Sequence, residues 1–293
     1  MTTPVYTIEE SNKIITDLIT HSLDKPFIIS RLSDNASTIA LTIYNSNIPH
    51  PLQINKMQTH DGIYCNSESD IELYAKVHNN AILASTYLAC FPSLCVYKQN
   101  EYLKIKGQDK GLHNRTLEPF YIIQSGSSDI PWTHALKGKT VLIINPFVES
   151  FKRQMDRGFT FFNTTEQSKQ IFLPGQGLVY YRSYNTLAGN RLHKNWFETF
   201  SIMCKHIKAL DFDIALLGCG GYGLPLCNFI NNMGKSAIYI GGGLQLLFGV
   251  SGNRWTNHDI IGNVSRLPGN LWTRPLDEEK VSGGNTIEGA CYW

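Results

Sequence analysis

The chain has 293 residues, a formal net charge of +2, and 42% hydrophobic against 17% charged residues, which excludes a disordered chain and, without a dense basic stripe, argues against a nucleic-acid-binding protein. No apolar run approaches the roughly 20 residues of a membrane-spanning helix, and the N-terminus has no signal-peptide pattern. The seven cysteines include no C-x-x-C pair, which is typical of a reducing compartment, so we expect a cytoplasmic protein with no membrane span.

The first half of the chain alternates helix and strand signals. Thr7 and Glu10 form a capping box that begins a helix, because each side chain can bind a backbone N–H of the first turn. The elements predicted after it are a strand over 26–31, a helix capped by residues 33–35, a long helix over about 68–88 and a short strand over 95–98.

The second half is more regular. Its predicted elements are a strand over 137–147, a helix over 148–158, a strand over 177–182, a helix over 195–210, a strand over 212–218, a helix over 224–235 and a strand over 236–243. Strands that alternate with helices at this spacing predict an α/β fold with a doubly wound, mostly parallel, Rossmann-like sheet. We expect a single domain with lobes of about 1–130 and 131–293, and an irregular C-terminal tail after Trp255 that wraps the surface.

A glycine-rich loop over 218–223 reads G-x-G-x-x-G between a predicted strand and a predicted helix. Backbone N–H groups at such a helix N-terminus bind phosphate, and a second glycine cluster over 241–243 ends the next strand. The candidates for close approach to a ligand are Gly220, Gly221, Gly223, Gly242 and Gly243. The alternative is that these glycines only permit tight packing of strand and helix. A dinucleotide or S-adenosylmethionine site would also need an acid at the end of the next strand, and none stands there.

Two charged residues at the end of the first predicted strand are candidates for chemistry. Arg31 would bind a diphosphate through the fork of its guanidinium. Asp34 would hold a metal or act as a base. The alternative is that the two form a salt bridge and a helix cap.

Three further residues have both a functional and a structural interpretation. Glu149 is a catalytic carboxylate or an acid in the first turn of a helix, where it suits the helix dipole. Asp61 is a base or a turn residue. Arg254 pairs a charge with the stacking surface of Trp255, or packs with it as an amphipathic edge of the core.

Four stretches of the second half resemble one group of proteins: WTHALKGKTVLIINPFVESFKRQ, DFDIALLGCGGYGLPL, GKSAIYIGGGLQLLFGVSGNRW and IEGACYW. They look like proteins of polysaccharide gene clusters and of large algal viruses, and the overall pattern is similar to nucleotide-sugar glycosyltransferases of the GT-D type. In the first half the resemblance rests on FIISRLSDNAS. It implies a GT-D-type Rossmann-like fold and transfer of one sugar from a UDP-sugar donor to a hydroxyl of a glycan acceptor, such as a viral capsid glycan or a surface polysaccharide.

The GT-D type carries the motif R-[IF]-G-D-G-E after its first strand. Arg31 and Asp34 match this motif, but the position of the glutamate is Ala36. This departure argues against a divalent metal, so the donor would be held by Arg31 and backbone N–H groups, and Asp34 or Asp61 would deprotonate the acceptor. Two alternatives stay open: an S-adenosylmethionine-dependent methyltransferase, which the glycine loop favours, and a nucleotide-sugar-binding protein without catalysis, which Ala36 favours.

Overall fold

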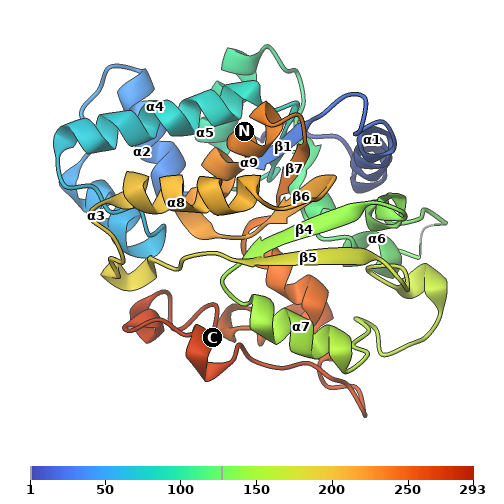
Figure 1. The fold of residues 1–293 in the computed structure, drawn as a ribbon. Coiled ribbons are helices and arrows are strands. Elements are labelled where there is room, and N and C mark those ends of the chain that lie inside the picture. The colour runs from blue at the N-terminus through green and yellow to red at the C-terminus, as the bar shows by residue number, and fades with distance from the viewer. Residues whose placement is uncertain (1, 127) are drawn as a thin grey trace.

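The computed structural model describes residues 2–126 and 128–293. Within these residues the strands form one seven-stranded parallel sheet in the order β3-β2-β1-β7-β6-β4-β5 (Figure 1). The strands are β1 (Ile28–Arg31), β2 (Tyr87–Cys90), β3 (Leu112–His113), β4 (Thr140–Asn145), β5 (Gly177–Arg182), β6 (Ile214–Leu217) and β7 (Ser236–Tyr239). The predicted α/β fold with a parallel, Rossmann-like sheet is confirmed. Strands from both expected lobes share this sheet, because β1 pairs with β7.

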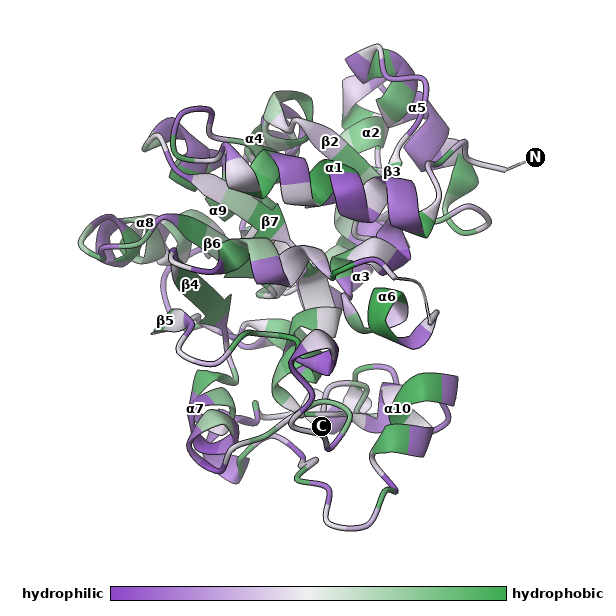
Figure 2. Ribbon diagram, turned by 90° about the vertical axis from the view of Figure 1, so that its right-hand side faces the viewer, coloured by the Kyte–Doolittle hydropathy of each residue, from purple (hydrophilic) through white to green (hydrophobic). Residues whose placement is uncertain are grey.

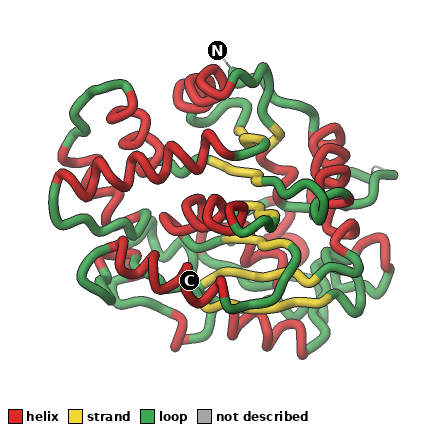
Figure 3. The backbone as a smooth tube through the Cα atoms, turned by 45° about the horizontal axis from the view of Figure 1, so that its top comes forward, coloured by secondary structure: helices red, strands yellow, loops and turns green. Residues whose placement is uncertain are grey.

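Helices cover both faces of the sheet (Figure 3). One face is covered by α1 (Ile8–Thr20), α6 (Phe120–Gln124), α7 (Val148–Asp156) and α10 (Asp259–Val264). The other is covered by α2 (Asn35–Tyr44), α3 (Pro51–His60), α4 (Glu68–Ala84), α5 (Val96–Lys106), α8 (Trp196–Lys208) and α9 (Gly223–Asn232). Helices bury both faces of β4 and β6, so both kinds of side-chain position in these strands are apolar. Their sequences are therefore continuous hydrophobic runs, coloured green in Figure 2.

The first half of the chain departs from the sequence prediction in several places. The helix expected over about 68–88 ends at Ala84, because Ser85 takes an extended conformation and leads into β2. The strand expected over 95–98 is instead the start of α5, which follows Cys95 at a φ of 54° and ends at Lys106. Four further α-helices and strands of this half were not predicted: α3, β2, the two-residue strand β3 and α6.

The end of β7 also differs from the prediction. The strand expected over 236–243 stops at Tyr239, because Gly241 has a φ of 74°, a conformation that glycine adopts readily. The chain turns there into a 3₁₀ helix, η6 (Gly241–Phe248). The second glycine cluster therefore begins a buried helix rather than ending a strand.

The tail after Trp255 is largely irregular, as expected, but its end does not lie on the surface. Ile287, Cys291 and Trp293 are buried, and the Asn253 N–H donates to the Trp293 carbonyl at 3.1 Å. The last residues thus pack back toward the carboxyl ends of the strands. In the part of the chain that the structure describes, no helix has both the length and the apolar character needed to cross a membrane.

Candidate functional site

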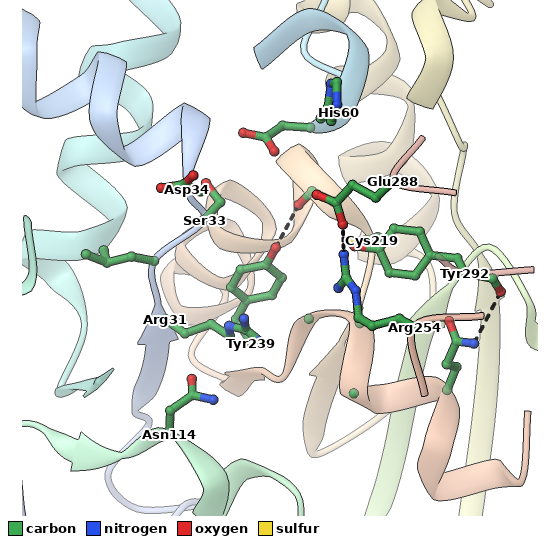
Figure 4. A pocket seen from close by; sticks show the side chains of 18 of the residues that line it. Arg31, Ser33, Asp34, His60, Asn114, Cys219, Tyr239, Arg254, Glu288 and Tyr292 are labelled. Carbon is green, nitrogen blue, oxygen red and sulfur yellow. Dashed lines mark hydrogen bonds and ion pairs between the residues drawn. The ribbon is translucent and has the colours of Figure 1, made fainter. Parts of the chain in front are cut away.

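A cavity of about 860 Å³ opens at the edge of the sheet where the strands end (Figure 4). All the strands are parallel, so their carboxyl ends meet there, as they do at ligand sites of open α/β sheets. The cavity is lined by the segments that follow the strands: residues 31–35, 91–95, 113–115, 145–147, 184–187, 218–220 and 241–243. Residues of the C-terminal tail, among them Glu288 and Tyr292, line the same cavity.

Arg31 is the last residue of β1 and lies across the end of β7. Its Nη1 donates to the Ile240 carbonyl at 2.8 Å, and its guanidinium lies 5.6 Å from the centre of the Phe91 ring. A Cβ at Gly241 would lie only 2.9 Å from Nη1, so this glycine makes room for the arginine. Among the described residues this is the one hydrogen bond of the guanidinium, which leaves N–H donors for an anionic ligand in the cavity.

Asp61 follows α3 and brings a carboxylate to the start of α2. Its Oδ2 accepts a 2.6 Å hydrogen bond from the Ala36 N–H, and its backbone carbonyl accepts one from the Gly221 N–H at 2.9 Å. Although part of the side chain opens to the cavity, the surrounding protein desolvates it, and this raises the pKa of Asp61 to about 7. A carboxyl that titrates near neutral pH at a cavity has the properties of a general base.

Asp34 also lines the cavity but is held by a different partner. Its carboxylate forms an ion pair with Lys98 of α5 and accepts a hydrogen bond from the Cys95 thiol at 3.7 Å. The hydrogen bond from Lys98 lowers the pKa of Asp34 below its ordinary value, which makes it a weak base. Its side chain makes no capping bond to α2, so the expected cap is wrong: Asp61 binds the first-turn N–H instead.

The residues after β1 do not fit a divalent cation. The carboxylate of Asp34 is neutralised by Lys98, and Ala36 offers no ligand atom on its side chain. Across residues 2–126 and 128–293, no three His, Cys, Asp or Glu side chains lie together as metal ligands.

The glycine loop after β6 reaches the cavity only in part. Gly220 lines it, with a φ of 56°, whereas Gly221 and Gly223 do not. A Cβ at Gly221 would overlap Ile63, and one at Gly223 would overlap the Tyr239 ring. The packing interpretation therefore describes these two glycines, and the N–H of Gly221 is already bonded to Asp61.

Gly242 and Gly243 line the cavity, but neighbouring side chains lie against both of them. A Cβ at Gly242 would lie 2.8 Å from the Tyr292 ring, and one at Gly243 would overlap the Glu118 carboxylate. Burial raises the pKa of Glu118 to about 7, against the opposing effect of the Arg31 charge. The structure thus places an acid at the end of β7, where the sequence of that segment has none.

Arg254 lines the cavity, but its charge is already paired. It forms an ion pair with Glu288 of the tail, and its guanidinium lies 4.9 Å from the centre of the Tyr292 ring and 5.8 Å from that of Trp255 (Figure 4). Trp255 is buried in the core, so the alternative, a charge and ring packed as an edge of the core, describes this pair. A ligand at this arginine would compete with Glu288 for its charge.

Glu149 lies outside the cavity, so the structure does not bring it to the other candidates. Its carboxylate forms an ion pair with Lys152 at 2.9 Å. The backbone N–H groups of Glu149 and Ser150 donate to Oε1 of Glu279 at 2.9 and 3.2 Å. The structural interpretation, an acid in the first turn of a helix, describes this residue.

Several cavity residues were missed from the sequence. Glu118 and Asn114 come from the short 3₁₀ helix η1 (Asn114–Leu117) and the residue after it, and Tyr239 donates its hydroxyl to the Gly220 carbonyl at 3.0 Å. The buried Asn114 Oδ1 and Ser33 Oγ have no hydrogen-bond partner among the described residues. Buried polar atoms are normally hydrogen-bonded, so these two are available to a molecule bound in the cavity.

Comparison of the chain with protein-family models, with curated proteins and with solved structures gives no match.

Proposed function

We propose that the chain is a glycosyltransferase that moves one sugar from a nucleoside diphosphate sugar to a hydroxyl of a glycan. The observation that supports it best is that Arg31 and Asp61 line one cavity at the carboxyl edge of the parallel sheet. A guanidinium with unused N–H donors can bind the diphosphate, and a carboxyl that titrates near neutral pH can act as the base in this transfer. The sequence resemblance supports UDP as the nucleotide.

In the proposed reaction Arg31 binds the diphosphate through its free N–H donors. Asp61 takes the proton of the acceptor hydroxyl as that oxygen attacks the anomeric carbon. The bond between the anomeric carbon and the diphosphate oxygen breaks, and UDP leaves with the electron pair. Arg31 stabilises the charge that develops on the leaving oxygen, so no metal is required for this step. A direct attack of this kind inverts the anomeric configuration.

The resemblance also supplies the proposed setting. The acceptor would be a glycan of a viral capsid or a surface polysaccharide, and the enzyme would act in the cytoplasm. Phe91 and Tyr292 give the cavity aromatic surfaces on which a base or a sugar ring can stack.

A methyltransferase that uses S-adenosylmethionine is the second candidate, and one observation favours it. Such an enzyme binds the ribose of its cofactor through an acid at the end of the strand after the glycine loop. Glu118 supplies a carboxylate beside Gly243 at that position, although it comes from another segment. The lack of an acid in the sequence of β7 is therefore no longer an argument against a methyltransferase.

A panel of ligands in a thermal unfolding assay tests the proposal. A ligand at 100 times its Kd adds about 2.7 kcal/mol to the free energy of unfolding, which is easily measured. UDP and UDP-sugars should raise the melting temperature, and S-adenosylmethionine should not. Release of UDP in the presence of a glycan acceptor then separates an enzyme from a binding protein. Stabilisation by S-adenosylmethionine alone would replace the proposed function with the second candidate.

A further inference from the structure

The turn after β3 presents two hydrogen-bond acceptors to the cavity. Asn114 begins η1 and Glu118 follows its end, so both side chains come from one short turn. The Asn114 side chain is directed into the cavity, on the side of Arg31 and Tyr239 (Figure 4). Asn114 is only 3% exposed, and its Oδ1 has no donor among the described residues.

Glu118 lies on the same turn and is half-buried, with its carboxylate at the cavity. Within the described part of the chain no hydrogen bond or ion pair is made by its carboxylate, which lies against the backbone of Gly243 at the end of β7. The absence of a side chain at Gly243 is what admits the carboxylate to this position. A buried amide oxygen without a donor is costly unless a ligand supplies one, and the Glu118 carboxylate is open to the same ligand from the cavity.

These acceptors indicate the chemistry of the ligand that would bind them. Two acceptors on one turn are satisfied by a ligand that presents two neighbouring O–H donors. Phosphate does not suit this side of the cavity, because its oxygens are acceptors and would face a carboxylate. Arg31 instead supplies the donors for a phosphate.

We propose that Glu118 and Asn114 form a subsite for a vicinal diol of the ligand that binds in the cavity. The inference rests on the proposed function for the identity of that ligand. A nucleotide sugar carries two such diols, one on the ribose and one on the transferred sugar. The position of Glu118 beside the end of β7 is the place at which open α/β sheets bind a ribose.

Binding measurements with Glu118→Gln test the subsite and separate its two sources. The probes are UDP, 2′-deoxy-UDP, UDP-glucose and S-adenosylmethionine, titrated by calorimetry into wild-type protein, Glu118→Gln and Asn114→Ala. Glu72→Gln is the matched control, because Glu72 is exposed and lies on α4, outside the cavity. The melting temperature of each variant without ligand is measured first, and a variant that does not fold is replaced by Glu118→Ala or Asn114→Ser.

If the subsite binds the ribose, Glu118→Gln should lower the affinity for UDP by about tenfold or more, which is the effect of losing a hydrogen bond to a charged group. The affinity for 2′-deoxy-UDP should fall less. If the subsite binds the transferred sugar, Glu118→Gln should lower the affinity for UDP-glucose by the same factor and leave the affinity for UDP unchanged. Asn114→Ala should weaken the same probe. A loss below about tenfold in both variants, for every probe that binds, would overturn the subsite.

Failure of the proposed function gives a different result. If S-adenosylmethionine binds and the uridine nucleotides do not, the proposed function is wrong. The subsite is then tested on the ribose of S-adenosylmethionine with the same variants and the same threshold. A wild-type protein that binds none of the probes would overturn both proposals.

Discussion

The Asp61 carboxylate accepts a 2.6 Å hydrogen bond from the backbone N–H of Ala36, across 25 residues of sequence. In the proposed resemblance to the GT-D type, Ala36 stands where that motif has its glutamate. A carboxylate therefore reaches this point at the end of β1 from another segment of the chain. It is held there by a first-turn N–H of α2, where a negative charge is favourable.

Asp61→Asn removes the proposed base but keeps an oxygen for the Ala36 N–H. We expect kcat to fall by about 10²-fold to 10⁴-fold, as for loss of a general base, in a protein that still folds. Asp61→Ala also removes the helix cap and should cost about 1 kcal/mol of stability in addition. Turnover and thermal unfolding of both variants check this. An Asp61→Asn enzyme with normal kcat would show that Asp61 is not the base.

The pH dependence of turnover should follow the ionisation of Asp61. Burial raises the pKa of Asp61 to about 7, and the nearby Asp34 adds to the effect while Lys98 opposes it. Because the base must be ionised, kcat/KM should rise with pH through about 7. Glu118 titrates in the same range, so the profile is compared with that of Asp61→Asn. A wild-type profile that stays flat through pH 7 would contradict the assignment.

The stability of the ligand-free protein should change in the opposite direction. The folded state keeps the Asp61 proton up to about pH 7, whereas the unfolded chain loses it near 3.8. Between these values the folded state binds more protons, so this group makes the protein less stable as pH rises. Asp61→Asn should reduce that slope, which chemical denaturation at several pH values measures.

Chelation of divalent cations should leave activity in place. Asp34 is paired with Lys98 and has no second carboxylate in the motif, and a single carboxylate binds a hard cation weakly. We expect turnover to persist in excess EDTA, and Asp34→Asn to reduce kcat less than Asp61→Asn does. Loss of activity in EDTA, restored by Mn²⁺ or Mg²⁺, would contradict a metal-free reaction.

Glu149→Gln should have no effect on donor affinity or kcat. Its carboxylate lies outside the cavity and pairs with Lys152 on a helix surface, and such a pair contributes about 0.5 kcal/mol or less. Steady-state kinetics of this variant beside Asp61→Asn make the comparison. A strong loss of kcat in Glu149→Gln alone would mean that catalysis takes place elsewhere.

The sequence was sufficient for those parts of the fold that burial dictates. β4 and β6 are covered on both faces, so their apolar runs identified them as strands of a parallel sheet. Parallel strands end at one edge, and this rule placed Arg31 at the cavity. By contrast β3 has two residues, too few for any periodic pattern, and with it η1 and Glu118 were missed.

The site depends on contacts between distant segments that no local pattern encodes. The requirement for glycine at 221 and 223 comes from the side chains of Ile63 and Tyr239, which only the fold brings there. The two aspartates likewise differ through distant contacts: burial raises the pKa of Asp61 to about 7, whereas the hydrogen bond from Lys98 lowers the pKa of Asp34. Charge and spacing gave both aspartates as candidates, and their environments distinguish them.

The central claim, that Arg31 binds the diphosphate of a nucleotide sugar in this cavity, is tested most directly by UDP affinity in Arg31 variants. Arg31→Ala should weaken UDP by about tenfold to 10²-fold, the effect of losing a charge-assisted hydrogen bond, and should lower kcat with a glycan acceptor. Arg31→Lys should restore only part of the loss, since an ammonium lacks the fork of the guanidinium. Arg153→Ala, at an exposed position of α7 outside the cavity, is the control. A folded Arg31→Ala protein that binds UDP and turns over as the wild type does would contradict the claim.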